Sequence, residues 1–162
     1  SHTKTKILDT RKTVPALRLL DKEAVRLGGG KNHRIGLFDM FLIKDNHIEI
    51  AGSITNAVNA CRNFQQKRNS DFKIEVETKN LEEVKEALAC SVDIIMLDNF
   101  KTELMKKAVT LINGKCLVEA SGNITIDNVK EVAETGVDFI SVGALTHSVK
   151  ALDISLEVEL KK

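Results

Sequence analysis

The stretch Asp93-Ile94-Ile95-Met96-Leu97-Asp98 decides the fold. It is a nearly continuous apolar run that ends in a carboxylate, which is typical of a strand covered on both faces in a parallel sheet. Five further β-rich runs recur along the chain, at residues 6–10, 41–44, 72–77, 116–120 and 139–143. The sequence therefore predicts six strands, each followed by a helical stretch.

Apolar residues recur at helical spacing in the segments between the strands. Three sets show this most clearly: Ile54, Val58 and Cys61; Leu81, Val84, Ala87 and Leu88; and Val129, Val132 and Ala133. The first helix is expected to end near Lys67, and Asn80 is placed to cap the second. Gly136 is placed to end the third helix.

Six consecutive β/α units predict a parallel sheet with right-handed crossovers, either a β/α barrel or an open doubly wound sheet. A complete eight-fold barrel needs about 250 residues, and this chain has 162. No GxGxxG sequence follows the first strand, so a dinucleotide-binding sheet loses its main support.

Composition excludes several classes of protein. The 24 basic and 23 acidic residues nearly balance, which argues against a nucleic-acid partner. No apolar run approaches the roughly 20 residues that cross a membrane. The three cysteines have no zinc-ligand spacing, and the polar amino end shows no signal peptide, so we expect small apolar cysteines in a cytoplasmic protein. The chain starts with Ser1 rather than Met, and we expect it to be a piece of a longer protein.

Basic residues gather at the first strand ends. Both architectures place their chemistry at the carboxyl ends of the strands. The cations that come first are Arg11, Lys12, His33, Arg34 and Lys44. Five basic side chains on one rim predict an anionic ligand, and the planar fork of arginine suits carboxylate and phosphate.

Glycine turns follow the last two strands, at Ser121-Gly122 and Gly143-Ala144. A glycine after a strand lets a ligand approach the backbone, and free N–H groups at the start of the next helix then face an anion. Barrels often build phosphate sites after their last two strands. The alternative is that each glycine only makes a tight strand–helix turn, and His147 joins the set through its nearness to Gly143.

Two carboxylates end the middle strands, Glu77 and Asp98. They could hold Mg²⁺ through water, since magnesium takes one or two carboxylates plus ligand phosphate, or they could bind sugar hydroxyls. Alternatively, these acids pair with Lys12 or Lys44. Either lysine would also serve as a Schiff-base nucleophile if its pKa were lowered by desolvation.

Seven motifs, in order, resemble the quinolinate phosphoribosyltransferase family, also called carboxylating nicotinate-nucleotide pyrophosphorylases. They are DTRKTVP (9–15), GGGKNHRIGL (28–37), LIKDNH (42–47), EVE (75–77), MLDNF (96–100), EASGNI (119–124) and SVGALTH (141–147). The resemblance covers essentially the whole chain, and the ordered set is far more specific than any single motif.

The resemblance implies an open, incomplete β/α barrel over 1–162, as the carboxy-terminal part of a two-domain subunit whose amino-terminal sandwich domain this chain lacks. It implies that quinolinate and phosphoribosyl pyrophosphate give nicotinate mononucleotide, pyrophosphate and CO₂ with Mg²⁺, in NAD biosynthesis. It also implies a homodimer or higher oligomer in which a neighbouring subunit completes the active site with an arginine. Alternatives are a related barrel enzyme or paralogue with another substrate, or a fragment that is inactive on its own.

The resemblance also assigns roles to residues of this chain. Arg11, His33, Arg34 and Lys44 match positions that bind or surround the quinolinate carboxylates, and Lys12 matches a lysine near pyrophosphate and ribose. Glu77 and Asp98 match the acids that meet ribose hydroxyls and Mg²⁺. Ser121, Gly122, Gly143 and His147 match the 5′-phosphate region. Three residues depart from the family pattern, which often has glycine at the positions of Ala16 and Asn123 and threonine at Val14.

Overall fold

The computed structural model describes residues 3–159 and contains one six-stranded sheet of parallel strands. The strand order is β1-β6-β5-β4-β3-β2. The strands are β1 (Lys6–Leu8), β2 (Phe41–Ile43), β3 (Ile74–Thr78), β4 (Ile94–Asp98), β5 (Leu117–Ser121) and β6 (Phe139–Ser141). All six predicted strands are therefore confirmed, with bounds that shift by at most two residues.

Seven helices lie between and after these strands in the described part of the chain. They are α1 (Arg18–Leu27), α2 (Asp45–Ala51), α3 (Ile54–Arg68), α4 (Leu81–Ala89), α5 (Thr102–Ile112), α6 (Val129–Ala133) and α7 (Ala144–His147). The side chain of Asn80 accepts a hydrogen bond from the Glu83 N–H, which confirms the predicted cap of α4. Helix α3 ends one residue beyond the predicted Lys67, and Gly136 follows α6 with a φ of 93°.

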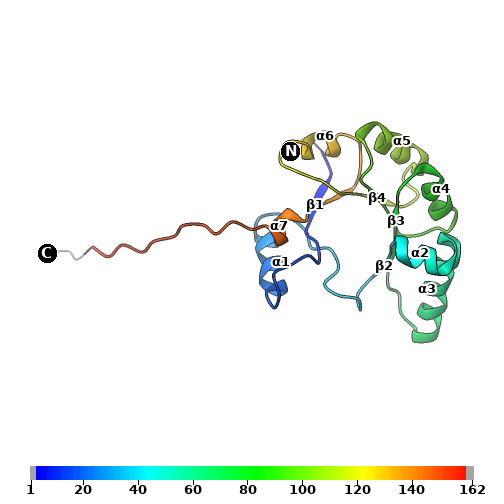
Figure 1. Ribbon diagram of the computed structural model, residues 1–162, viewed down its shortest axis with the longest axis horizontal. Helices are drawn as coiled ribbons and strands as arrows, with labels where there is room; N and C mark the ends of the chain where they lie inside the picture. The colour runs from blue at the N-terminus through cyan, green and yellow to red at the C-terminus, as the bar shows by residue number, and fades with distance from the viewer. Residues whose placement is uncertain (1–2, 160–162) are drawn as a thin grey trace.

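The sheet curves with its helices outside, but it does not close (Figure 1). Strands β1 and β2 are its two edges, and no pairing joins them within residues 3–159. The segment between α1 and β2 crosses the opening, and it adds one bridge to β1 between Lys31 and Leu8 (Figure 1). The fold is thus the expected open β/α barrel.

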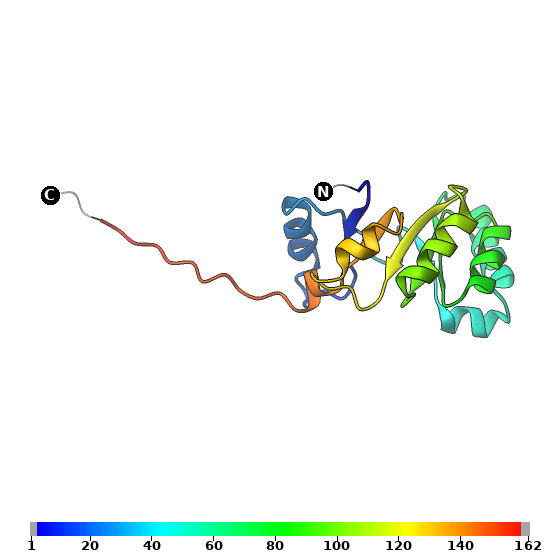
Figure 2. The ribbon, with the colours of Figure 1, turned by 90° about the horizontal axis from the view of Figure 1, so that it is seen from above.

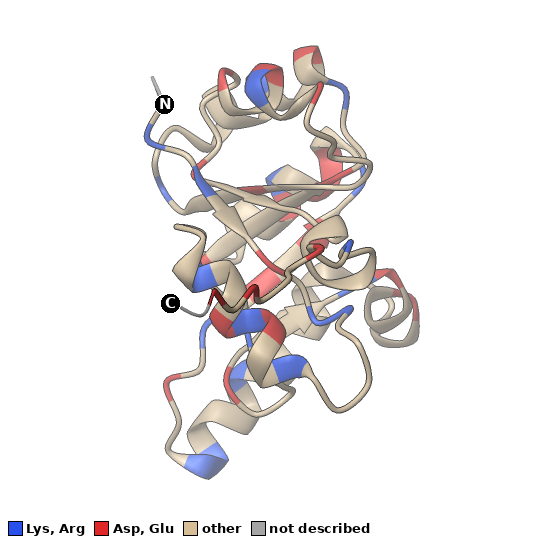
Figure 3. Ribbon diagram, turned by 90° about the vertical axis from the view of Figure 1, so that its left-hand side faces the viewer, with Lys and Arg blue, Asp and Glu red and all other residues tan. Residues whose placement is uncertain are grey.

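The two faces of the sheet differ sharply in chemistry. Side chains such as Ile74, Val76 and Ile95 point outward into the apolar core against the helices, where burial of each contributes about 1.5–3 kcal/mol. Because side chains alternate along a strand, the neighbouring positions face the inside of the curved sheet. These inner positions include Glu75, Glu77, Met96, Glu119 and Ser141, all buried, and Figure 3 marks the acidic positions on the central strands in red.

The three cysteines are half-buried, pack against the core and form no disulfide among the described residues, as expected of small apolar side chains. Within residues 3–159, no helix has the length and apolar character needed to cross a bilayer.

Beyond α7 the chain leaves the barrel in an extended conformation over residues 148–159 (Figures 1 and 2). Four of its side chains are apolar and 77–90% exposed: Leu152, Ile154, Leu156 and Val158. Each alternates with a polar residue, so the apolar side chains of this segment fall at every second position.

Candidate active site

A buried ion pair fixes the loop that carries two of the predicted cations. Lys22 on α1 lies 2.6 Å from the Oδ1 of Asp9, with the side chains 4% and 0% exposed. Asp9 Oδ1 also accepts the His33 N–H at 2.8 Å, and Lys22 Nζ donates to the His33 carbonyl at 2.9 Å. Asn32 donates to the second carboxylate oxygen at 2.6 Å. The backbone at His33 is therefore held from both sides by a charged and fully engaged network.

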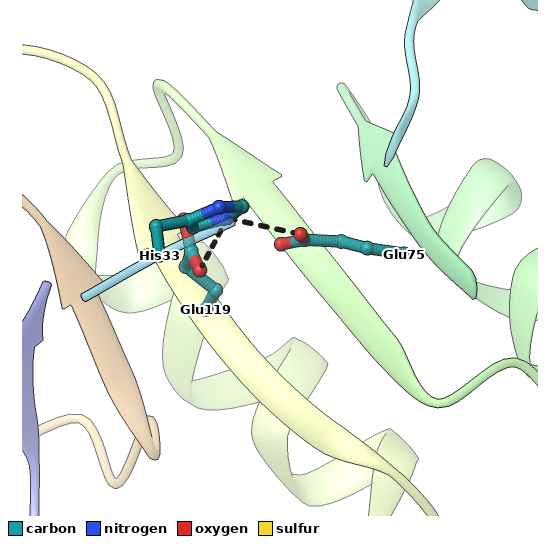
Figure 4. A group of neighbouring side chains, drawn as sticks. All are labelled: His33, Glu75 and Glu119. Atoms are coloured by element: carbon teal, nitrogen blue, oxygen red, sulfur yellow. Dashed lines mark ion pairs between the residues drawn. The ribbon is translucent and has the colours of Figure 1, made fainter. Parts of the chain in front are cut away.

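The His33 ring enters the inside of the sheet and meets two glutamates (Figure 4). Its Nε2 lies 3.1 Å from Glu75 Oε2 and 3.5 Å from Glu119 Oε2, and both carboxylates are 0% exposed. The other ring nitrogen, Nδ1, accepts the Arg34 N–H at 2.8 Å. The imidazole thus contacts strands β3 and β5 on one side and the backbone of its own loop on the other.

Burial and neighbouring charges shift the pKa values of the acidic and imidazole groups in this cluster. Burial, and then the negative Glu119, raise the pKa of Glu75 to about 7. Burial would lower the pKa of His33, but the two carboxylates together outweigh it and shift that pKa upward. The Arg34 N–H opposes a charged ring, because it occupies the Nδ1 atom that a second proton would need.

Two guanidinium groups lie near this cluster without a carboxylate partner. Burial, and then the positive charge of Arg11, lower the pKa of Arg34. Arg34 donates from Nη1 to the Met40 carbonyl at 3.1 Å, and the Nε atoms of both arginines are buried with no hydrogen-bond acceptor. No ion pair involves either side chain in the described part of the chain. Two like charges held together with free donors form a site for an anion.

Lys44 and Glu77 form an ion pair of 2.5 Å, with the lysine 46% and the glutamate 9% exposed. The alternative that a strand-end acid pairs with Lys44 is therefore confirmed for Glu77. Asp98 ends β4 and accepts a hydrogen bond from the neighbouring Asn99 side chain at 2.8 Å. One oxygen of each carboxylate thus stays free of these contacts.

Lys12, Gly143 and His147 lie together, although they come from opposite ends of the chain. A Cβ atom built on Gly143 would lie 2.9 Å from the His147 ring and 4.0 Å from Lys12 Cδ. Helix α7 begins at the residue after Gly143, as expected. The glycine leaves room for the cation and the imidazole to approach the same strand end.

The turn at Ser121-Gly122 also requires glycine, because Gly122 has a φ of 95° and its Cβ would lie 2.1 Å from Asn99 Oδ1. Helix α6 begins at Val129, as the predicted pattern of Val129, Val132 and Ala133 indicates, so a loop separates it from the turn. Within that loop the Asn128 side chain donates to the Asn123 carbonyl at 2.9 Å. Beside the turn lies a pocket of about 390 Å³, lined in part by Asn99, Gly122 and Asn123.

The departures from the family pattern have a backbone explanation in two cases. Ala16 has a φ of 65° and Asn123 a φ of 52°, so both are in the left-handed region that glycine adopts most easily. Asparagine visits this region at little cost, whereas alanine does so under strain. Val14 is 43% exposed, its backbone N–H donates to Asp21 and its carbonyl accepts from the Leu17 N–H, and nothing in the structure explains the valine side chain.

Four charged residues of this network were not predicted as site residues from the sequence: Asp9, Lys22, Glu75 and Glu119. The signal for the glutamates was present, because a charge between two apolar residues of a strand indicates an inner face that is not apolar. Nothing local marks Lys22 as buried, since it lies in a helix rich in exposed residues.

An open β/α barrel whose strand ends gather cations, acids and glycine turns has the arrangement that barrel enzymes place at their active sites. The comparisons make the family definite. The sequence profile described as "Quinolinate phosphoribosyl transferase, C-terminal domain" matches residues 1–157. The chain belongs to this family.

Named relatives agree. Over 168 aligned residues the chain is 56% identical to "Nicotinate-nucleotide pyrophosphorylase [carboxylating], chloroplastic" of Oryza sativa subsp. japonica, covering 94% of this chain and 45% of that protein. The solved nicotinate-nucleotide pyrophosphorylase of Francisella tularensis is 52% identical with a TM-score of 0.91, over 97% of this chain and 55% of that one. The chain therefore spans about half the length of these relatives. Thiamine phosphate pyrophosphorylase of Pyrococcus furiosus, at 19% identity and a TM-score of 0.52, shares the fold alone.

Proposed function

We propose that this chain is the catalytic barrel of an enzyme that transfers phosphoribosyl from phosphoribosyl pyrophosphate to quinolinate. Decarboxylation follows, and the products are nicotinate mononucleotide, pyrophosphate and CO₂. The observation that carries the proposal is the pair of guanidinium groups, Arg11 and Arg34, which lie close enough for the charge of Arg11 to lower the pKa of Arg34 and form no ion pair within residues 3–159. A dicarboxylate would supply the missing acceptors. The names of the rice and Francisella tularensis relatives, given above, support the same reaction.

In this proposal each group at the strand ends has a role. Arg11 and Arg34 hold the quinolinate carboxylates, in a pocket that His33 and Lys44 complete. Lys12 stabilises the departing pyrophosphate, and the carboxylates of Glu77 and Asp98 face the ribose. The 5′-phosphate lies against the two glycine turns, with the residues Ser121, Gly122, Gly143 and His147.

The chemistry then follows from charge. The quinolinate nitrogen attacks the anomeric carbon of the ribose as pyrophosphate leaves, and positive charge develops on the sugar. Catalysis of such a step depends on positioning and on fixed charges, so Glu77 and Asp98 stabilise the cationic sugar. The positively charged ring nitrogen of the ribosylated dicarboxylate then stabilises the electron pair left on the ring carbon when CO₂ departs, and a proton from water completes that carbon. No nucleophilic serine or cysteine is needed.

The acidic residues also suit Mg²⁺. Magnesium takes one or two carboxylates together with ligand phosphates. Asp98 accepts one hydrogen bond, on Oδ2, and the ion pair of Glu77 with Lys44 uses only Oε2, so each keeps an oxygen free. We propose that these two residues hold the ion, which would neutralise charge on the pyrophosphate.

The rest of the enzyme lies outside this chain in the proposal. A neighbouring subunit of a homodimer or larger oligomer would complete the active site, so the 162-residue chain alone should bind quinolinate but turn over little. Location in the cytoplasm stays a prediction, and the printed name of the rice relative calls that protein chloroplastic.

Isothermal titration of the chain with quinolinate and with nicotinate tests the proposed acceptor. Quinolinate should bind more tightly, because nicotinate lacks the second carboxylate. Arg34→Ala should weaken quinolinate binding by more than tenfold, about 1.4 kcal/mol. Equal affinity for the two ligands, or no change in the variant, would remove the dicarboxylate assignment. Trapping of a substrate adduct by borohydride would favour the rival reading, a barrel enzyme with a Schiff-base lysine.

A further inference from the structure

We propose that Glu75 and Glu119 are positioning residues of the acceptor pocket, which hold the His33 ring so that its Nδ1 fixes the Arg34 backbone and the direction of the Arg34 guanidinium. This inference rests on the proposed function, because it gives the cluster beneath the pocket a role in binding the same dicarboxylate.

The first support is the placement of the two carboxylates. Glu75 comes from β3 and Glu119 from β5, the two strands that flank β4, and the His33 ring reaches both (Figure 4). A ring held from two strands cannot turn with its loop. The backbone of His33 is held independently by Asp9 and Lys22. Ring and backbone are therefore fixed by separate sets of residues.

The second support is the loss of folding stability that two buried carboxylates bring. Both carboxylates are 0% exposed, their Oε2 atoms share the single Nε2 of His33, and their Oε1 atoms have no hydrogen-bond partner among the described residues. Buried polar atoms without hydrogen-bond partners destabilise a fold. Two such carboxylates destabilise the interior of the barrel. Destabilising groups of this kind are typical of functional sites, where activity is kept at the expense of stability.

The third support is the path from the ring to the arginine. His33 Nδ1 accepts the Arg34 N–H at 2.8 Å. Among residues 3–159 the Arg34 side chain bonds only the Met40 carbonyl, which leaves its buried Nε available to a ligand. A rotation of the ring would remove the acceptor from the Arg34 N–H. The direction of the guanidinium would then be set by the Met40 contact alone.

His33, Glu75 and Glu119 are residue types that bind divalent metals, but the tautomer of the His33 ring is evidence against a metal site. Their candidate ligand atoms lie within 4.8 Å of one another. A histidine that binds a metal through Nε2 carries its proton on Nδ1 and donates it to a neighbour. Here Nδ1 faces a donor, the Arg34 N–H, so the neutral ring has its proton on Nε2, toward the glutamates.

Two double variants of the 162-residue chain test the proposal. Glu75→Gln with Glu119→Gln keeps an electronegative oxygen at both places, whereas Glu75→Leu with Glu119→Leu removes it. Met96→Leu serves as the control, because Met96 is a buried apolar residue of the inner face on β4 and has no charge or hydrogen-bond donor to hold the His33 ring. Quinolinate affinity is measured by calorimetry and stability by the thermal midpoint.

We expect the glutamine variant and the control to bind within about threefold of the parent chain, and the leucine variant to bind at least tenfold more weakly. The leucine variant should unfold no earlier than the parent, because apolar side chains replace two buried acids whose Oε1 atoms have no partner among the described residues. Unchanged affinity in the leucine variant would overturn the proposal, and so would an equal loss in both double variants. A merely structural role predicts the reverse pattern, with lower stability and normal affinity.

Nuclear magnetic resonance of the His33 ring nitrogens and the Arg34 amide separates this proposal from the proposed function. We expect a protonated Nε2, a bare Nδ1, and an Arg34 amide resonance that moves in the leucine variant. If the parent binds no quinolinate, the proposed function fails while this readout still decides the positioning. An unmoved Arg34 amide would overturn the proposal, as would tight Zn²⁺ binding that the leucine variant loses.

Discussion

Replacement of Lys22 by methionine should destabilise the chain strongly, because this lysine neutralises a carboxylate that has no access to water. Lys22 Nζ bonds both Asp9 Oδ1 and the His33 carbonyl, and Asp9 is 0% exposed. Methionine keeps the length and the helical propensity of the side chain. It leaves a buried carboxylate without its counter-charge, and such losses amount to about 3–5 kcal/mol. Asp9 keeps two hydrogen bonds, from Asn32 and from the His33 N–H, so we expect about 3 kcal/mol, the lower end of that range.

Urea unfolding followed by circular dichroism measures this change, since the chain has no tryptophan or tyrosine for fluorescence. Arg26→Met on the same helix is the matched control, because Arg26 pairs with Glu23 at 2.6 Å while both side chains are at least half exposed. Exposed pairs contribute little, so the control should unfold like the parent. Asp9→Asn added to Lys22→Met should recover part of the loss. If Lys22→Met and Arg26→Met unfold alike, the buried pair does not hold the loop.

The remaining predictions concern backbone strain and pH. Ala16→Gly should raise the free energy of unfolding by about 1 kcal/mol, because alanine at a φ of 65° is strained; a lower midpoint in urea would contradict this. Gly122→Ala should destabilise more than Gly114→Ala, since both glycines have positive φ but only Gly122 meets Asn99 Oδ1 at 2.1 Å; equal midpoints would argue against the close approach. The raised pKa of Glu75, about 7 against the ordinary 4.5, means that its contribution to stability is complete below about pH 4.5 and is lost as pH rises to 7. Glu75→Gln should remove that fall from the pH profile of unfolding in metal-free buffer, and an identical slope in parent and variant would contradict it.

The architecture was predictable because each strand of a parallel sheet that is covered on both faces consists of a local run of apolar residues. The stretch Asp93-Ile94-Ile95-Met96-Leu97-Asp98 needs no distant information to be read as a strand. Residues at the strand ends, such as Arg11 and Arg34, could be grouped for the same reason, since parallel strands end at one edge.

The network beneath the site was not predictable in this way. Lys22 is a solvent-facing residue by every local rule, and only the packing of α1 against Asp9 and the His33 loop shows it to be buried. The pairing of His33 with Glu75 and Glu119 joins residues up to 86 positions apart through the curvature of the sheet. Resemblance to a family supplied roles for the residues at the rim but none for these.

The extended segment after α7 has a practical consequence for work with the purified chain. Its apolar side chains at Leu152, Ile154, Leu156 and Val158 stand in water at every second position, with backbone donors and acceptors along both edges. Such a strand is a template for intermolecular pairing. We expect light scattering to grow with protein concentration and to fall when the chain is shortened to end at Ser148, so that samples for calorimetry stay monodisperse.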